Sequence, residues 1–407
     1  MTTTPTTPTA TAVPMPSPHS AGCPFGPPPA YTEAATRGPV TRADLPDGGS
    51  CWLATGYAEV RAILSDRRFS ADARHPAFPF LLPGRRELVA ANPTFVRLDD
   101  PEHARLRRMV TGDFLVKKVA ALRPAIQRIV DEALDAMTEG RTSADLVAEF
   151  ALPVPSLVIC LLLGVPYEDR ARFQGLSRIL LSNTSTVEEV GAASDELRDY
   201  LTELAALKRE RPADDIISRL AARDDLTTRE VAATGVLLLV AGHETTANMI
   251  ALSTALLVDQ PEQVAKLADP ELVPGAVEEL MRVLTIVDNG LPRVATEDVE
   301  LGGVLIRAGE GVIALVSTAN RDETVFGDAG HRPVDEVDLG RDARRHLAFG
   351  FGVHQCLGQP LARAELQIAL PTLFRRLPGL RLAVPREELA FRTESLIFGM
   401  RSLPVAW

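Results

Sequence analysis

Helical periodicity dominates the pattern of apolar and polar positions along this chain. Apolar residues recur every three or four positions, and several of these segments begin at a proline, which suits the first helical position. Asp100-Pro101 predicts the start of one helix over Glu102–Thr111, with Asp100 as N-cap and Pro101 at the first helical position. Further helices are predicted over Pro124–Met137, Ala193–Lys208 and Pro274–Leu284.

A much longer helix is predicted in the second half of the chain. Thr227-x-x-Glu230 forms a capping box, and the helix that it opens runs to about Asp259, just before Pro261. Such a helix has about 33 residues and is about 50 Å long. Its middle, residues 235–249, is apolar on most sides, so it should cross the interior of the protein.

Strand patterns are short and confined to two regions. One lies at Ala54–Tyr57 and the residues before it. In the other, Val299–Leu301 and Val304–Ile306 flank Gly302-Gly303 as a hairpin, and Gly311–Val316 follows as a further strand. The pattern as a whole predicts a mainly α protein with small β-sheets.

Composition permits a large apolar core and argues against several other classes of protein. The 407 residues are 46% apolar and 24% charged, which is ordinary for a globular protein. A net charge of −11 argues against general binding to nucleic acid. The four cysteines are widely spaced and form no C-x-x-C pair, which argues against disulfides or a zinc site and for a reducing compartment.

The chain shows no pattern for a membrane anchor or for export. Its longest apolar runs, Leu157–Leu163 and Val236–Ala241, fall short of the roughly 18 residues that a span requires. No charged segment followed by an apolar one opens the sequence, so we expect a soluble, cytoplasmic protein. Residues 1–22 are mostly Thr, Pro and Ala and are predicted to be a disordered tail, followed by a single domain over residues 23–407.

The richest motif lies near the C-terminus, over residues 349–358 (Phe-Gly-Phe-Gly-Val-His-Gln-Cys-Leu-Gly). Two glycines separated by one residue permit a tight bend, and Cys356 follows just ahead of an amphipathic helix. Unpaired N–H groups and the helix dipole at that position favour a thiolate, which is a good metal ligand. The alternative is a buried, inert cysteine, which a lone Cys would favour.

This pattern, Phe-Gly-x-Gly-x-His-x-Cys-x-Gly, resembles the haem-thiolate loop of the cytochrome P-450 monooxygenases, and the chain matches every position. The resemblance implies haem b as cofactor, Cys356 as its axial ligand, and contacts from Phe349, Gly350 and Gly358. It also implies a triangular single-domain fold, with haem between a long central helix and the cysteine loop with the proximal helix behind it. Three further segments resemble soluble actinobacterial enzymes of secondary metabolism, including antibiotic biosynthesis, in a class that includes the vitamin D hydroxylases: residues 152–156, 273–280 and 353–359.

A second motif breaks the rules of helix propensity in the middle of the long helix. Residues 241–246 read Ala-Gly-His-Glu-Thr-Thr, and glycine and threonine are weak helix formers. The segment is similar to the family's Ala-Gly-x-Asp/Glu-Thr signature, so Ala241 and Gly242 would face the haem on its oxygen side. By that resemblance Thr245 would hydrogen-bond the activated oxygen and Glu244 would relay protons from solvent. The alternative is a packing glycine, helix-interior threonines and a solvated glutamate.

Four residues are candidates to hold the haem propionates. His103 and Arg107 lie one helical turn apart and could meet one propionate. The resemblance adds Arg293 and His354. The alternative for His103 is an ordinary solvated helix residue.

Glu279 and Arg282 match the family's structural Glu-x-x-Arg pair, which locks its helix to the meander ahead of the haem loop. Taken alone, an acid–base pair at this spacing is common on helix surfaces. The meander departs from the family pattern, because residues 326–338 are a few positions longer and no arginine falls in the usual register. Arg332 is the candidate substitute, but the residue that completes the Glu279–Arg282 network stays open.

Electrons must come from a separate protein, because the chain has no flavin or nicotinamide fingerprint. A ferredoxin with its reductase is the expected donor. Basic residues near the expected proximal face could steer it, although a solvated charged face explains them almost as well. They are Arg105, Arg108, Lys117, Lys118, Arg344, Arg345 and Arg363.

The candidate substrate pocket is mostly apolar. We therefore expect a macrolide or polyketide, a terpenoid or a steroid-like substrate. Each lining residue could equally be ordinary core. The candidates are Phe78, Leu81, Leu82, Leu181, Val240, Ala241, Ile286, Val287, Ile397 and Phe398.

The interpretation that follows is a monomeric haem-dependent monooxygenase that uses O2 to hydroxylate or epoxidise this substrate. Two alternatives remain. The same oxidant could couple or desaturate its substrate without inserting oxygen, or the protein could be a haem-binding sensor without turnover.

Overall fold

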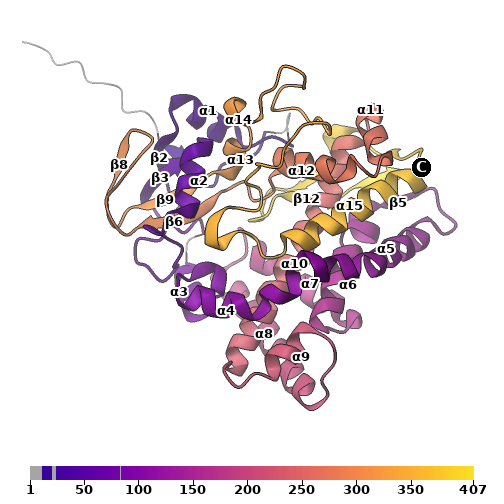
Figure 1. The fold of residues 1–407 in the computed structure, drawn as a ribbon, viewed down its shortest axis with the longest axis horizontal. Coiled ribbons are helices and arrows are strands. Elements are labelled where there is room, and N and C mark those ends of the chain that lie inside the picture. Colours follow the sequence, from indigo (N-terminus) through magenta and orange to yellow (C-terminus); the bar gives the residue numbers. More distant parts are fainter. Residues whose placement is uncertain (1–11, 21–23, 83) are drawn as a thin grey trace, which may run out of the picture.

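The computed structural model describes residues 12–20, 24–82 and 84–407. It is mostly helical and broadly triangular, with the main sheet at one corner and strands of the smaller sheets, such as β5 (Ser143–Asp145) and β12 (Gly399–Ser402), away from it (Figure 1). The main helices that position the site are α4 (Glu102–Thr111), α5 (Val116–Thr138), α6 (Pro153–Leu163), α8 (Val187–Glu210), α10 (Thr228–Leu257), α12 (Val273–Leu284) and α15 (Gln359–Arg376). The other α-helices are α1 (Pro29–Arg37), α2 (Tyr57–Ser65), α3 (Arg86–Ala91), α7 (Arg170–Leu181), α9 (Ile216–Ala221), α11 (Pro261–Val264), α13 (Val316–Ala319) and α14 (Glu323–Phe326).

The long helix α10 crosses the core as its sequence predicts. The Thr227 hydroxyl accepts the Glu230 N–H at 3.2 Å, and the Glu230 carboxylate accepts the Thr227 N–H at 2.8 Å, so the capping box is confirmed. The helix packs against α6, α8 and α15. Within the described residues it is the one helix long and apolar enough to cross a membrane, but 67% of its apolar window is buried inside the protein, as in a core helix.

Two predicted helices begin earlier in the structure than proposed. The helix predicted from Pro124 is α5, which starts at Val116 and carries Pro124 in its interior. The helix predicted from Ala193 is α8, which starts at Val187 behind a capping box between Thr186 and Glu189. A proline is a frequent helix start but not an obligatory one, because neighbouring packing can offset the hydrogen bond that it removes.

The helix α4 has its predicted bounds, although its first turn is capped differently. Pro101 occupies the N-cap position rather than the first helical position. The Asp100 carboxylate accepts the Ala104 N–H at 3.1 Å, so Asp100 still satisfies a free amide of the first turn.

The main sheet has six strands in the order β1-β2-β3-β9-β6-β4. Its strands are β1 (Val13–Pro14), β2 (Val40–Asp44), β3 (Ser50–Ala54), β9 (Gly311–Ala314), β6 (Leu291–Ala295) and β4 (Phe69–Ser70). The small sheets comprise the hairpin β7 (Val299–Leu301) with β8 (Val304–Ile306), the pair β11 (Ala390–Arg392) with β12 (Gly399–Ser402), and β5 (Ser143–Asp145) with β13 (Pro404–Ala406) and β10 (Arg381–Leu382).

The predicted hairpin is confirmed with its bounds. The strand predicted at Ala54–Tyr57 and the residues before it is confirmed only in its first part, since β3 ends at Ala54 and Tyr57 is already the first residue of α2. Strand β9 stops at Ala314 because the chain turns at once into α13.

The N-terminal segment differs from the predicted disordered tail. Residues 1–11 and 21–22 lie outside the described part, but Val13–Pro14 pairs in parallel with β2, and Met15 is buried. His19 pairs with Asp288 and stacks on Phe398 at 3.9 Å between ring centroids. Composition misled the prediction, because two apolar side chains and a few hydrogen bonds suffice to dock a short segment on an existing sheet edge.

Candidate active site

The loop that carries Cys356 is closed by its own backbone. Gly350 and Gly352 adopt φ values of +70° and +73°, which favour glycine. A Cβ on Gly352 would lie 2.3 Å from the Leu64 carbonyl oxygen, so only glycine fits this approach. The Cys356 N–H donates to the Phe349 carbonyl at 2.8 Å, and α15 begins three residues later. The sulfur is therefore fixed just ahead of a helix N-terminus, as predicted.

Opposing groups act on the Cys356 thiol. Burial raises its pKa, while the N–H groups of Gly358 and Gln359 and the charges of Arg107 and Arg363 lower it. Burial is the largest of these effects, so the pKa of the thiol lies above its usual value. A metal cation bound at Sγ would deprotonate the thiol outright.

Cys356 is an exposed residue although it lies deep within the fold. Ala241, in the middle of the buried helix α10, is exposed in the same way. Both residues therefore border accessible space inside the molecule, as the walls of a cofactor site would.

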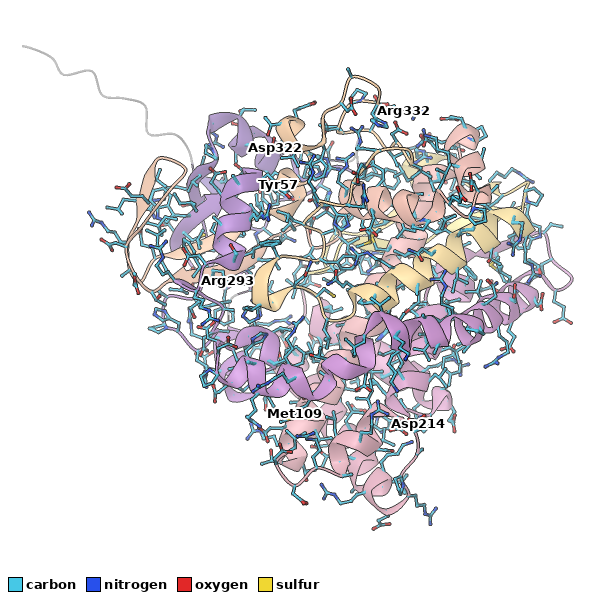
Figure 2. The ribbon with its side chains drawn as sticks, viewed as in Figure 1. Tyr57, Met109, Asp214, Arg293, Asp322 and Arg332 are labelled. Atoms are coloured by element: carbon cyan, nitrogen blue, oxygen red, sulfur yellow. The ribbon has the colours of Figure 1, made fainter. Side chains whose placement is uncertain are left out.

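The four predicted propionate partners come together from three parts of the chain. The rings of His103 on α4 and His354 in the cysteine loop lie 4.1 Å apart. Arg107 donates to the Gln355 carbonyl of that loop, and Arg293 lies on β6, beside the loop (Figure 2). His103 Nε2 and His354 Nδ1 are buried, and neither has a hydrogen-bond partner among the described residues.

The electrostatics of this cluster fit an anionic group. Burial, followed by the charge of Arg97, lowers the pKa of Arg293 to about 10. Burial, followed by the charges of Arg293, His103 and Arg107, lowers the pKa of His354 to about 3. Asp100, which lies 3.0 Å from His103 Nδ1, and Asp99 oppose these shifts but do not outweigh them. Two haem propionates would supply the missing negative charge and hydrogen-bond acceptors.

Sequence reasoning missed Arg97. Burial lowers its pKa, and its charge reaches Arg293. Arg97 lies three residues before the helix start recognised at Asp100-Pro101, but its place in the cluster depends on burial, which no local pattern marks.

Glu244, the acid of the second motif, lies in a buried environment rather than a solvated one. Glu244 is buried, and its Oε2 accepts a hydrogen bond from Arg392 of β11 at 2.7 Å. Its Oε1 is buried without a partner in the described structure. The solvated glutamate of the alternative interpretation is therefore wrong. Thr245 donates its hydroxyl to the Ala241 carbonyl at 2.8 Å, the back-bond that threonine makes within helices.

The Glu279–Arg282 pair is a buried network rather than a surface pair. The Arg282 guanidinium contacts both Glu279 oxygens, at 2.7 and 2.9 Å, and donates at 2.8 Å to the carbonyls of Asn320 and Val334. Both side chains are fully buried.

The residue that completes this network is Arg341, and the candidate Arg332 is wrong. Arg341 Nε donates to Glu279 Oε1 at 3.3 Å, while its other nitrogens donate to the carbonyls of Phe326 and Arg332. Arg332 instead pairs with Glu262 at the outer edge of the molecule (Figure 2). Because the meander is longer than in the family pattern, the arginine that bonds to Glu279 lies at position 341. Spacing alone therefore indicated Arg332, which is the wrong residue.

The predicted pocket residues fall into two groups. Phe78, Ile286 and Phe398 are buried in packed apolar clusters. Partly or more fully exposed side chains occur at Leu81, Leu82, Leu181, Val240, Ala241, Val287 and Ile397. The role of either group in substrate binding stays a prediction.

Comparison with known proteins decides the family. A family model described as cytochrome P-450 matches residues 89–272 and 263–378. The chain is a cytochrome P-450. It is 63% identical to cytochrome P-450-SU2 of Streptomyces griseolus over 100% of both chains, and 46% identical to the vitamin D3 dihydroxylase of the same organism, also over 100% of both.

The solved structures agree with this assignment. The crystal structure of the mycinamicin VIII methyl hydroxylase from Micromonospora griseorubida, bound to mycinamicin VIII, superposes with a TM-score of 0.90 at 40% identity, covering 97% of this chain and 100% of that one. The predicted family and fold are confirmed. As a cytochrome P-450 the protein is a monooxygenase, and its cofactor is thiolate-ligated haem b.

Proposed function

We propose that this cytochrome P-450 inserts one oxygen atom from O2 into a largely hydrophobic natural-product-type molecule, by hydroxylation or epoxidation. One observation carries the proposal: the Cys356 loop lies against a buried cluster of cationic side chains and hydrogen-bond donors, formed by His103, Arg107, Arg293 and His354. Bound haem supplies O2 activation and the oxidising power for the reaction. Every other task falls to residues of this chain.

Cys356 is proposed as the axial ligand. The Cys356–Phe349 backbone hydrogen bond and the two left-handed glycines hold its sulfur in place. His103, Arg107, Arg293 and His354, together with Arg97, are proposed to hold the propionates. With these contacts the cofactor would lie between α10 and α15, where Ala241 and Cys356 border accessible space.

Thr245 and Glu244 are proposed to deliver protons. The Thr245 hydroxyl faces the partly exposed side of α10, and Glu244 stands next to it. One Glu244 oxygen is held by Arg392, and the other has no hydrogen-bond partner among the described residues and lies 3.8 Å from His243 Nε2. A proton can pass from the carboxyl to the hydroxyl through an intervening water, while the apolar surroundings exclude bulk solvent.

A ferredoxin, served by a reductase, is the proposed electron donor, and the cytoplasm is the proposed location of this monomer. Of the seven basic residues proposed to steer the donor, Arg105, Arg344 and Arg363 are engaged in ion pairs. Arg108, Lys117 and Lys118 are exposed on α4 and α5, and Arg108 follows directly on Arg107, which contacts the cysteine loop. An acidic redox protein would complement this surface.

The relatives support a natural-product substrate. One is named pentalenic acid synthase, another nocardicin C N-oxygenase, and one solved structure holds mycinamicin VIII. For this chain we propose the same broad class: polyketide or macrolide, terpenoid or steroid-like.

The test combines a ligand variant with product analysis. The Cys356→Ser variant should lose the reduced-CO Soret band that is typical of thiolate ligation. An unchanged band would overturn the ligand assignment. Turnover under isotopically labelled O2 should place one label in the product, whereas an unlabelled coupled or desaturated product would overturn oxygen insertion.

A further inference from the structure

A second cavity opens beside the N-terminal end of α10. It has a volume of ≈ 450 Å³, which is large enough for a small organic molecule. Most of its wall is apolar. The lining comes from the segment after α3, from α4, α7 and α8, and from the first turns of α10. It includes Pro93, Phe95, Leu106, Leu180, Ala233 and Val236.

Two arginines meet at the rim of this cavity on one neutral acceptor. Arg198 of α8 and Arg229 of α10 both line it, and both donate to the amide oxygen of Asn92, at 3.1 and 2.9 Å. Guanidinium groups bind carboxylates far better than they bind a neutral amide. Both guanidinium groups converge on the Asn92 amide, which is a weaker acceptor than a carboxylate. A ligand carboxylate at this point would therefore bind them more strongly.

The acids nearby neutralise only part of this charge. Asp195 accepts from Arg198 at 2.7 Å, on the exposed surface of α8. Glu230, the other charged lining residue, pairs with Arg105 and caps α10. In the described part of the chain Arg229 has only the Ala91 carbonyl and the Asn92 amide as partners.

A row of residues on α10 connects this cavity with the proposed oxygen site. The helix is mostly buried, but partly or fully exposed residues recur at steps of four positions, at Arg229, Ala233, Leu237, Ala241 and Thr245. Residues four positions apart are neighbours on a helix surface, so they form one continuous stripe that winds gradually around α10. Val236 and Val240 lie beside this stripe and are also partly exposed. The stripe begins at the arginines, follows the apolar wall and ends at the proton-delivery pair.

We propose that this cavity binds the carboxylate end of an elongated apolar monocarboxylic acid, so that the carbon to be oxidised lies at the far end of the stripe. The inference rests on the proposed function, since it names the substrate class of the same site. Arg229 and Ala241 are twelve positions apart, which corresponds to about 18 Å along the helix. The site would therefore select acids that are oxidised far from their carboxylate.

The test is a binding experiment on the haem-loaded protein with dodecanoate and hexadecanoate as probes. Isothermal titration calorimetry and the substrate-induced shift of the Soret band are followed in parallel, with 1-dodecanol as the uncharged comparison. We expect dodecanoate to bind at least tenfold more tightly than dodecanol, as a charged hydrogen bond predicts. Equal affinities for the acid and the alcohol would overturn the proposal.

Variants locate the effect. Arg229→Gln and Arg198→Gln should each weaken dodecanoate binding about tenfold and leave dodecanol binding unchanged. The matched control is Arg223→Gln, because Arg223 is exposed near the start of α10, pairs with Asp225 and does not line the cavity. If Arg229→Gln binds dodecanoate as tightly as Arg223→Gln does, the carboxylate site is not there.

This outcome is separable from a failure of the proposed function. A normal reduced-CO band and oxygen insertion into neutral compounds, without any preference for acids, would refute only the carboxylate site. Loss of the band or of oxygen insertion for every substrate would refute the function itself, whatever the calorimetry shows.

Discussion

At the scale of single residues, the site depends on groups that are held in place by only one or two neighbours. The Thr245 hydroxyl is bonded within its own helix to the Ala241 carbonyl. Glu244 is tied to Arg392, which lies almost 150 positions later in the chain. The proposed proton-delivery pair thus combines a local contact with one that only the folded protein provides.

Replacing Thr245 separates proton delivery from cofactor binding. Thr245→Ala should keep its haem and its substrate-induced spectral shift, because the hydroxyl bonds only to its own helix. Product formed per electron pair should fall by about tenfold or more, with the lost electrons recovered as hydrogen peroxide. The measurement compares reductant consumed with product and peroxide formed.

Thr245→Ser is the control, since it retains a hydroxyl at the same position. It should remain close to wild type in the yield of product per electron pair. A wild-type yield in Thr245→Ala would show that another group delivers the protons.

Residues close to the motifs were predictable from the sequence, whereas their distant partners were not. Cys356, His103 and Glu279 could be assigned because fixed spacing within one segment defines their neighbours. Arg392 and Arg341 reach the site across the fold, so no local pattern marked them. Arg97 was adjacent to a recognised motif, but its role depends on burial, which a single sequence does not show.

At the scale of elements, the meander before the cysteine loop is anchored to α12 by buried charge. Arg341 bonds to Glu279 and to the carbonyls of Phe326 and Arg332, and its side chain is almost fully buried. Its removal would leave Glu279 with one fewer donor and several carbonyl groups without partners.

Arg341→Gln should therefore lower the free energy of unfolding by about 3–5 kcal/mol, the usual cost of removing one member of a buried ion pair. Urea unfolding followed by circular dichroism measures the change. Arg332→Gln is the control, and its partly exposed ion pair predicts a loss of no more than about 1 kcal/mol. Equal losses in the two variants would contradict the assignment of Arg341 to the network.

Element boundaries followed the sequence where side chains cap the backbone. The capping box at Thr227 predicted the start of α10, and the same signature at Thr186 marks the start of α8. Proline was the weaker guide, since Pro124 lies inside α5. Side-chain hydrogen bonds to free amides define a helix start more directly than the fixed φ of proline does.

At the scale of the whole molecule, the described N-terminal segment joins parts that are far apart in sequence. Val13–Pro14 extends the main sheet beside β2. The Ser17 N–H donates a hydrogen bond to the Tyr31 hydroxyl at 2.9 Å. His19 reaches Asp288 and Phe398. Low complexity in a sequence does not exclude docking when a sheet edge is available.

Deletion of residues 1–20 should lower the free energy of unfolding by about 3 kcal/mol, because Val13 and Met15 no longer bury their side chains. Deletion of residues 1–11 is the matched control, since it keeps every contact described for residues 12–20. Chemical denaturation of both proteins measures the difference. Equal stability of the two truncated proteins would show that the segment contributes nothing.

The Arg341 hydrogen bonds also affect how well the chain between Phe326 and Arg332 tolerates insertions. It donates to the carbonyls of Phe326 and Arg332, which are the two ends of the short excursion at residues 327–331. Because the ends are pinned together by one side chain, extra residues between them would cost only the slowly growing entropy of a longer closed loop. Insertions between Phe326 and Arg332 should leave the Cys356 loop undisturbed. This position is therefore suitable for attaching a tag or a tethered redox partner.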